Sequence, residues 1–417
     1  MNQKIRKIIV LISILLIGIF FGHKMSGFSQ KIWKISERYV YFFLNKAGLS
    51  DLEKKIDKDK VISHKENEYK EAKGNSFSII FTKIKSFPGR TASIFLSENN
   101  SNDPEYEIFT QDGLIIKNNI VSEINFPSLF YSSVGLRSIL PIDGDYFALS
   151  GFSTYSCKYA SLFRVKDGKN VIRSKCLPDI KAVNYDGLGA AFVKTNDSVL
   201  LSIGTPTTSS ETINKLAQIP ESIFGKIISI KTKALSNYNN EKINYKIYSL
   251  GHRNPQGLVK HNDNIFSLEH GPQGGDELNR IIEGKNYGWP ITSFGTRYSN
   301  GESYAKNFSN ISYQDPIFIL LPAVAPSALN VCPKNLSNYY KPYHCLMGLS
   351  LKERSILIFI LNESNSKVIA FEKINLGGRL RHFGLNKNGT LFFDSDDYFY
   401  LSMDKDGLYR LKFTKFR

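Results

Sequence analysis

The chain has 417 residues, of which 42% are hydrophobic and 22% charged, as expected for a globular protein of one large domain or two. Its 29 Phe and 22 Tyr beside only two Trp favour aromatic strands over a helical bundle. The formal charge of +16 is spread along the sequence, without a basic stripe interleaved with aromatic residues. We therefore expect no nucleic-acid partner.

At the N-terminus, basic residues precede an apolar run from Ile8 to Gly22, which is the pattern of a signal sequence. His23 and Lys24 follow the run directly, so that no clear small-x-small cleavage site adjoins it. We favour an uncleaved signal anchor over residues 1–25, with a cleaved signal peptide as the alternative. Because basic residues before such a run stay in the cytoplasm, we predict an exported protein on the periplasmic side, anchored in the inner membrane.

Residues 26–73 are rich in Lys, Glu, Ile and Tyr and predict one or two amphipathic helices in a charged linker. From 74 to 417 the sequence changes to short alternating apolar segments separated by turn dipeptides, as in LPIDGDYFALSG and LNKNGTLFF. These turn residues tolerate positive φ and suit β-hairpins. A hairpin unit that recurs over this length predicts an all-β domain, a six-bladed β-propeller.

The four cysteines lie in two close pairs, Cys157 with Cys176 and Cys332 with Cys345. Two local disulfides fit an oxidising compartment, and unpaired structural thiols are the alternative. Their spacings match no zinc site.

The stretch from Gly251 to Tyr298 is dense in Gly, Pro, Asn, His, Arg and acidic residues, a composition that fixes backbone carbonyls and charged groups in turns. Within it, the segment EHGPQGGDE brings Glu269, Asp276 and Glu277 close to a Gly-Pro turn. Carboxylates and exposed carbonyls are the ligands of calcium. The segment predicts either a calcium site or a solvated acidic turn.

Three motifs of this stretch, GHRNPQGL, EHGPQGGDELN and GKNYGWP, resemble in order and spacing the signature of the PQQ-dependent aldose (glucose/sorbosone) dehydrogenases. The resemblance is weaker at PAVAPSAL, SLKERSI, GRLRHFGLNKNGTLFF and GLYRL. It implies an exported six-bladed β-propeller that binds pyrroloquinoline quinone (PQQ) through calcium. It also implies oxidation of aldose or oligosaccharide substrates at the anomeric carbon by hydride transfer to the quinone.

The resemblance assigns cofactor contacts to Arg253 and Asn254, and to Arg379 and Arg381 of the GRLRH segment, which would hold the cofactor's carboxylates. Lys352 matches a cofactor lysine of some family members. A ring of Arg and Lys suits a tricarboxylate ligand. For calcium, the resemblance implies ligation of the cofactor-bound ion by the carbonyls of Gly271 and Pro272.

A second, structural calcium site is implied at Glu277 and the carbonyl of Tyr287. The histidines within or beside the matched motifs, His252, His270 and His382, favour a hydrogen-bonded structural role, and none is nominated as a base.

One feature departs from the family pattern. Family members carry a catalytic His in a segment like H-x-G-G-x-L-x-F, and the corresponding segment here, NYDGLGAAF, has Tyr185 at that position. A tyrosine with an ordinary pKa near 10 is a poor base, so Asp186 is a possible substitute. The sequence therefore supports a PQQ- and calcium-dependent aldose dehydrogenase, with a catalytically degenerate propeller that binds a glycan or protein as the alternative.

Overall fold

The computed structural model describes residues 69–87, 89–99, 104–117, 120–127, 135–154, 156–178, 180–207, 210–304 and 313–414. The expected signal anchor at 1–25, and the expected linker up to residue 68, lie outside these residues. Within them, no helix is long and apolar enough to cross a membrane. Residues Lys70–Lys73, predicted to belong to the helical linker, form strand β1 instead, so the sheet structure begins slightly before residue 74.

The described residues form mostly β structure. Four of the sheets contain four antiparallel strands each, in chain order across the sheet. The strands are β7 (Leu136–Ile142), β8 (Asp145–Ser153), β9 (Lys158–Arg164) and β10 (Asn170–Arg173); β11 (Phe192–Lys194), β12 (Ser198–Ile203), β13 (Lys226–Lys231) and β14 (Lys246–Leu250); β15 (Pro255–His261), β16 (Asn264–Glu269), β17 (Asp276–Ile281) and β18 (Phe318–Leu320); and β19 (Pro326–Val331), β20 (His344–Ser350), β21 (Ser355–Leu361) and β22 (Val368–Asn375).

A fifth sheet joins the two ends of the described chain. Its order is β1-β2-β25-β24-β23-β3-β4-β5-β6, and β2 pairs with β25 along its length. The remaining strands are β2 (Ser78–Lys85), β3 (Thr91–Ser97), β4 (Glu105–Thr110), β5 (Leu114–Lys117), β6 (Ile120–Glu123), β23 (Leu380–Leu385), β24 (Phe399–Met403) and β25 (Gly407–Thr414). Only two residue pairs join β23 to β3, and they are parallel. This sheet therefore consists of two antiparallel units that meet edge to edge.

Short helices occupy the connections between strands. They are η1 (Ile180–Ala182), α4 (Glu211–Asn214), η2 (Lys215–Gln218), α5 (Thr232–Ser236) and α6 (Lys334–Tyr339).

The predicted hairpin turns are present where both central residues tolerate a left-handed backbone. Asp143 and Gly144 link β7 to β8 with φ of 45° and 84°, which suits the twist of a two-residue hairpin. The LNKNGTLFF hairpin is reduced to an isolated bridge between Leu385 and Leu391. There the Asn386 side chain accepts hydrogen bonds from backbone N–H groups of its own turn, which curls the chain locally.

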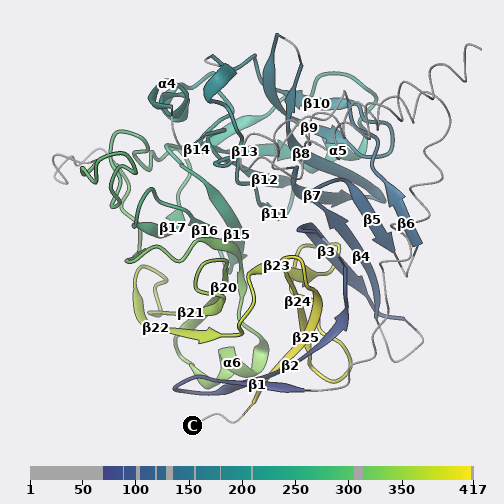
Figure 1. The fold of residues 1–417 in the computed structure, drawn as a ribbon, viewed down its shortest axis with the longest axis vertical. Helices are drawn as coiled ribbons and strands as arrows, with labels where there is room; N and C mark the ends of the chain where they lie inside the picture. Colours follow the sequence, from purple (N-terminus) through teal and green to yellow (C-terminus); the bar gives the residue numbers. More distant parts are fainter. Residues whose placement is uncertain are drawn as a thin grey trace, which may run out of the picture. The chain divides into compact units, whose positions relative to one another are not determined.

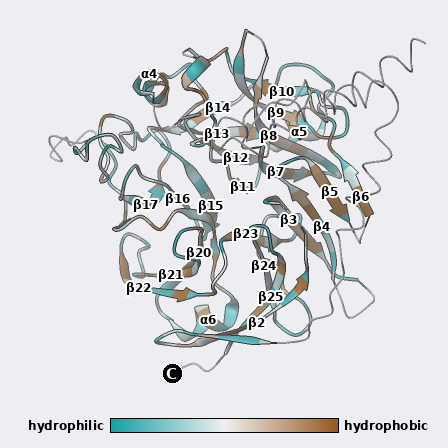
Figure 2. Ribbon diagram, in the orientation of Figure 1, coloured by the Kyte–Doolittle hydropathy of each residue, from teal (hydrophilic) through white to brown (hydrophobic). Residues whose placement is uncertain are grey.

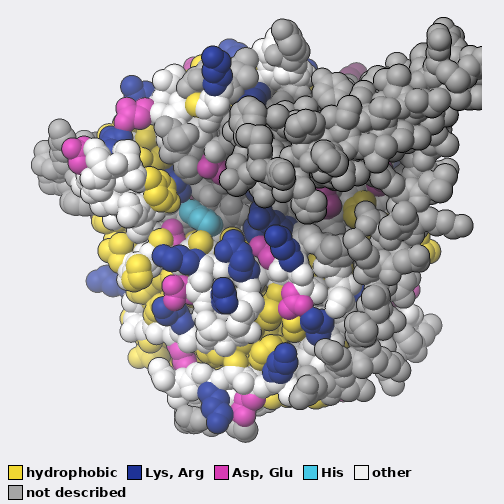
Figure 3. Space-filling model, in the orientation of Figure 1, with side chains coloured by type: hydrophobic (Ala, Val, Ile, Leu, Met, Phe, Trp, Pro, Cys, Tyr) yellow, Lys and Arg dark blue, Asp and Glu magenta, His cyan; other side chains and the backbone are white. Residues whose placement is uncertain are grey.

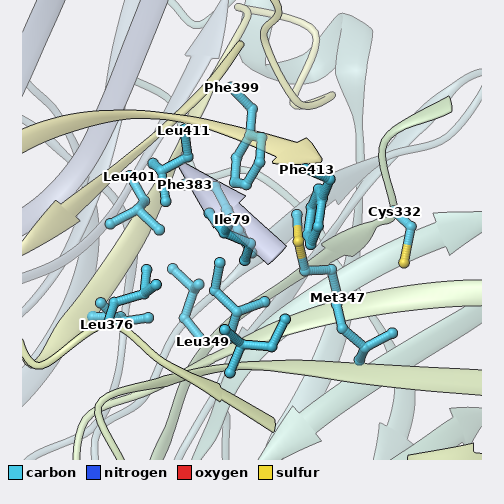
Figure 4. Close-up of a cluster of buried hydrophobic side chains, with 14 of the residues drawn as sticks. Ile79, Cys332, Met347, Leu349, Leu376, Phe383, Phe399, Leu401, Leu411 and Phe413 are labelled. Atoms are coloured by element: carbon cyan, nitrogen blue, oxygen red, sulfur yellow. The ribbon is translucent and has the colours of Figure 1, made fainter. Parts of the chain in front are cut away.

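Buried hydrophobic side chains of the described residues form six clusters, each between two neighbouring antiparallel units. Figure 4 shows one of them, in which Ile79, Leu401 and Leu411 from β2, β24 and β25 lie opposite side chains of β20. In Figure 2 the brown of hydrophobic residues is concentrated on strands such as β5 and β7. Face-to-face packing of this kind requires apolar residues on both sides of a strand, as in SILIFIL of β21, which is buried throughout.

The first strand of each unit lies closest to a common centre. Figure 1 shows β3, β7, β11, β15 and β23 near the middle, with β6, β10 and β22 farther out. A cavity of about 60 Å³ is lined by residues from all of these first strands and β19, among them Ser93, Ser138, Phe192, Leu258, Asn330 and His382. This arrangement is propeller-like, as predicted, and it brings loops that are distant in sequence to one end of the cavity.

Both cysteine pairs are disulfide-bonded, with Cα–Cα distances of 5.2 Å for Cys157–Cys176 and 5.4 Å for Cys332–Cys345. The predicted local pairing is therefore confirmed.

Candidate active site

The motif GHRNPQGL lies between β14 and β15 and is held from both sides. Gly251 has φ of 78°, and a side chain there would lie 2.2 Å from the Asn286 side-chain oxygen. The carbonyl of Arg253 accepts hydrogen bonds from the backbone and the hydroxyl of Thr205, at 2.8 and 3.1 Å. Gln218 donates to the Trp289 carbonyl at 2.6 Å. The long connection between β12 and β13 thus braces the motif.

Behind the motif, His252 is fully buried and hydrogen-bonded at both ring nitrogens. Its Nε2 lies 2.8 Å from the Ser249 hydroxyl, and its Nδ1 lies 3.1 Å from Glu269. The ring also stacks on Tyr287, with centroids 4.6 Å apart. These contacts confirm the predicted structural role of His252.

Two buried carboxylates face each other across neighbouring strands. Glu269 of β16 pairs in register with Glu277 of β17, and Asn279 donates to both, at 2.7 and 3.1 Å. Burial, followed by the charge of Glu269, raises the pKa of Glu277 to about 8. The side-chain oxygen of Asn279 is buried without a hydrogen-bond partner among the described residues. The charge of Arg253 opposes this shift but is the smallest of the influences on the pKa of Glu277.

Asp276 is used for structure. One of its oxygens accepts the N–H of Gly271 at 3.0 Å, and the other accepts those of Val324 and Ala325 at 2.7 and 2.8 Å. The backbone at Lys352 then donates to the Val324 carbonyl at 3.1 Å. Asp276 thus ties the EHGPQGGDE turn to the loop before β19, and that loop in turn contacts the Lys352 loop.

The Gly271-Pro272 turn is tightly folded. A side chain at position 271 would lie 2.0 Å from the carbonyl oxygen of Gly275, so only glycine fits. Within the described part of the chain, no N–H or O–H group donates to the carbonyl of Gly271, Pro272 or Tyr287.

Arg253 is 5% exposed and lies over the Trp289 ring at 5.2 Å. Its Nη1 donates to the His270 carbonyl at 3.1 Å, whereas its Nε is buried without a partner among the described residues. Burial lowers the pKa of this guanidinium. Asn254 is equally buried, and its side-chain oxygen accepts a hydrogen bond from Gln256 at 2.9 Å. Both predicted cofactor residues therefore lie at the site, at the start of β15.

Arg379 and Arg381 lie at the start of β23. Arg381 is paired with a carboxylate of this chain, Asp404. Arg381 is nearly buried and makes a two-pronged ion pair with Asp404. The Nε of Arg379 lies 3.5 Å from the same carboxylate, and half of this side chain is exposed. Its Nη1 is also 3.5 Å from the Leu351 carbonyl, beside Lys352. The structure thus brings Arg379, Arg381 and the exposed Lys352 together.

Positive charges converge on His270. Burial, together with the charges of Arg253, Arg381 and a third arginine, Arg137, lowers the pKa of His270 to about 3. Its Nε2 lies 2.5 Å from the Pro326 carbonyl, so this nitrogen carries the proton of a neutral ring. Burial also lowers the pKa of His382 to about 3. Figure 3 shows Lys and Arg side chains gathered beside a histidine near the centre of the face it draws.

Tyr185, at the sequence position of the family's catalytic histidine, does not present its hydroxyl to the site. The side chain is 2% exposed, and the hydroxyl donates to the carbonyls of Phe152 and Tyr159, at 2.5 and 3.0 Å. Burial raises its pKa further above the ordinary value. The expectation that Tyr185 could serve as the base is therefore corrected, because the ring is turned into the core against Gly151.

Asp186, by contrast, is exposed beside the arginines. Its charge stabilises the protonated forms of both Arg137 and Arg253. Of the two candidate bases in this segment, Tyr185 and Asp186, only Asp186 therefore lies beside the arginines.

Arg137 is the residue that our sequence analysis missed. It is the second residue of β7, is 8% exposed, and donates from Nη2 to the Tyr185 carbonyl. The sequence feature that could have revealed it is a single charged residue, Arg137, in the mainly apolar segment LRSILPI. A larger cavity of about 430 Å³ lies elsewhere, between β10 and the loops that flank β13, and includes none of the site residues.

Residues 176–399 match the family model described as glucose/sorbosone dehydrogenase, which is more than half of the chain. The protein therefore belongs to the glucose/sorbosone dehydrogenase family. It is similar to the aldose sugar dehydrogenase YliI of Escherichia coli, with 30% identity over 157 residues, 36% of this chain and 41% of the relative. The matched regions span about half or less of the curated relatives' length.

Solved structures share the fold. The apo-form of the soluble aldose sugar dehydrogenase from Escherichia coli has a TM-score of 0.63 and 18% identity, over 80% of this chain and 99% of that one. The PQQ-bound form of an aldose sugar dehydrogenase from Streptomyces coelicolor has a TM-score of 0.53 and 20% identity, over 82% of this chain and 99% of that one.

Proposed function

We propose that the protein is a PQQ- and calcium-dependent dehydrogenase that oxidises aldose sugars at the anomeric carbon. The observation that carries the proposal is the convergence of the charges of Arg253 and Arg381 on His270, with Arg379 sharing the Asp404 carboxylate of Arg381. Family membership and the PQQ named for a structural neighbour support the choice of cofactor.

The residues present fit a cofactor with several carboxylates. Arg253 is buried with an unpartnered Nε, which is costly unless an anion compensates the charge. Arg379 is half-exposed and aligned with Arg381 by the shared Asp404 carboxylate. Arginine forks bind carboxylates through two parallel hydrogen bonds. We infer that Arg253, Arg379 and Arg381 hold the cofactor's carboxylates, with Lys352 as a mobile fourth cation and Asn254 as a hydrogen-bonding group.

The donor set also fits calcium. No group of three or more His, Cys, Asp or Glu side chains in the described ranges is arranged to hold a metal ion. The proposed ligands are instead mainly carbonyl oxygens, of Gly271 and Pro272 for the ion beside the cofactor and of Tyr287 for the second ion. Calcium accepts such oxygens. At the second site, Glu269 and Glu277 are neighbouring carboxylates whose mutual repulsion a divalent cation would relieve.

When bound, the quinone supplies a hydride acceptor for the anomeric carbon. The chain's own task is then to orient the sugar and to take the proton of its hydroxyl group. We infer that Asp186 accepts this proton, because its charge acts on Arg137 and Arg253 and it directly follows the position where the family pattern places a base. Tyr185 contributes only its carbonyl, which holds Arg137.

We further propose a six-bladed propeller, exported and anchored by residues 1–25. Six hydrophobic clusters and the cavity lined by six first strands support this number of blades. The two disulfides support an oxidising compartment.

Reconstitution of the purified full chain with calcium and PQQ tests the function. We expect a cofactor-dependent absorbance change and reduction of an electron-accepting dye when an aldose is added. Saturable PQQ binding without dye reduction by any sugar would leave the alternative, a non-catalytic binding propeller, which the buried Tyr185 hydroxyl favours. Absence of PQQ binding would reject the proposal.

A further inference from the structure

Four arginines occupy equivalent places around the cavity. Arg90 directly precedes β3, Arg137 is the second residue of β7, Arg253 directly precedes the turn into β15, and Arg381 is the second residue of β23. Because each of these strands is the first of its antiparallel unit and lines the cavity, their N-terminal ends lie at the same end of it. The mutual repulsion of Arg137 with Arg90 and Arg381 agrees with this placement.

Arg137, like Arg253, has no counter-charge in contact with it among the described residues. Among the described residues it makes a single hydrogen bond, to the Tyr185 carbonyl, and no ion pair. Its Nε is buried without a partner. Burial lowers its pKa to about 9. Arg381, at the equivalent place on β23, has the Asp404 carboxylate as a two-pronged partner.

A buried guanidinium without a carboxylate partner is costly, and in proteins such groups are paired or bind an anion. Asp186 acts on Arg137 through its charge, and Arg137 itself makes a hydrogen bond only to the Tyr185 carbonyl in the described chain. The missing partner is therefore most simply supplied by a ligand.

The position of Arg137 separates it from the proposed cofactor residues. Arg253, Lys352, Arg379 and Arg381 belong to the units that begin with β15, β19 and β23, whereas Arg137 begins the β7 unit. Arg137 is anchored by the carbonyl of Tyr185, next to Asp186, which is the proposed proton acceptor. A group bound at Arg137 would thus lie next to the Tyr185–Asp186 segment.

We propose that Arg137 binds an anionic substituent of the sugar, so that the preferred substrates are aldoses that carry a carboxylate or a phosphate ester. The inference rests on the proposed function, since it concerns the substrate of that site. The guanidinium fork suits both anions, whose oxygens accept two parallel hydrogen bonds. A neutral aldose would leave the charge of Arg137 unpaired in the complex.

The test compares three sugars that differ at one carbon: glucose, glucuronate and glucose 6-phosphate. Isothermal titration of each into the full-length protein, with calcium and with or without PQQ, measures binding independently of turnover. We expect at least about tenfold tighter binding of one or both anionic sugars than of glucose, the scale of one charge-assisted hydrogen bond. The anionic sugar that binds more tightly identifies the preferred substituent, a carboxylate or a phosphate ester. A complete lack of dye reduction would reject the proposed function, whereas the measured preference for anionic sugars would still stand.

Variants of Arg137 test whether this residue causes the preference for anionic sugars over glucose. Arg137→Leu should bring the three affinities to within about twofold, whereas Arg137→Lys, which keeps the charge without the fork, should retain part of the preference. Arg173→Leu is the matched control: it removes one positive charge from β10 of the same sheet, where Arg173 is exposed, and should change nothing. Circular dichroism confirms folding, and Arg137→Lys alone decides the matter if Arg137→Leu is unfolded.

Three results would overturn the inference. They are equal binding of the three sugars by the wild type, equal preference in the wild type and both Arg137 variants, and weaker PQQ binding in the Arg137 variants with sugar preference unchanged. In the last case the anion at Arg137 belongs to the cofactor.

Discussion

Two segments border the same group of arginines and differ in how they use their side chains. In the cradle segment, residues 251–298, Arg253 donates to the His270 carbonyl, and the carbonyls of Gly271 and Pro272 accept no hydrogen bond from the described residues. His252 and Asp276 brace the backbone of this segment. In the Tyr185 segment, residues 183–192, the side chain at the family's catalytic position is turned into the core, and its backbone carbonyl holds Arg137 instead.

This contrast assigns cofactor binding to the cradle segment and the proposed proton transfer to the Tyr185 segment. The cradle segment combines a buried arginine with backbone carbonyls, a set that suits the proposed quinone and calcium. In the Tyr185 segment, the residue at the family's catalytic position is a structural anchor, with Asp186 as the adjacent carboxylate and Arg137 as a nearby positive charge. Changes in the two segments should therefore have separable effects on cofactor binding and on turnover.

The largest effect is expected at Asp186. Asp186→Asn keeps the shape of the side chain but removes its ability to take a proton, so we expect kcat to fall by ~10²–10⁴-fold with PQQ affinity changed less than about twofold. Steady-state dye reduction and a PQQ titration measure the two quantities. Undiminished turnover in this variant would show that the base lies elsewhere.

The cradle segment should respond in the opposite way. Arg253→Leu removes a buried charge-assisted contact to the cofactor, and we expect the Kd for PQQ to rise about 100-fold. The measurement is a spectroscopic titration of the folded variant, with Arg173→Leu again as the control. If the affinity is unchanged, PQQ does not bind in the cradle segment.

Removal of calcium should affect the cradle segment alone. A ligand that binds only the folded state adds about 2.7 kcal/mol to the free energy of unfolding at 100 times its Kd. We expect calcium to raise the thermal midpoint, and Glu277→Gln to lose part of this increase because the paired charge of Glu269 and Glu277 is reduced. Magnesium at the same concentration is the control. Identical midpoints with calcium and with chelator would contradict both calcium sites.

The smallest effect concerns the core side of the Tyr185 segment. Tyr185→Phe leaves the carbonyls of Phe152 and Tyr159 without their hydroxyl donor, so we expect the free energy of unfolding to fall by ~1–3 kcal/mol. Urea denaturation measures this change, and PQQ affinity should stay as in the wild type. Because position 185 faces the core, Tyr185→His should not increase sugar oxidation; a gain would show that the segment can turn outward.

The sequence by itself determined much of the cradle segment and of the architecture. Turn residues such as Asp143-Gly144 and alternating apolar runs specify hairpins through local backbone preferences. Motifs such as EHGPQGGDE keep their spacing because the glycine turn and the carbonyls are made by neighbouring residues. The pairing of Cys157 with Cys176 and of Cys332 with Cys345 was likewise predictable from short separations.

Only the tertiary structure decided the direction of side chains at residues whose partners are distant in the chain. Tyr185 turns inward because Gly151 leaves room for its ring and two carbonyls of neighbouring strands accept its hydroxyl. Arg381 is committed to Asp404, and Arg137 joins the site because β7 begins at the same end of the cavity as β15 and β23. Local sequence cannot specify such contacts, since they depend on which first strands become neighbours when the sheets assemble around the cavity.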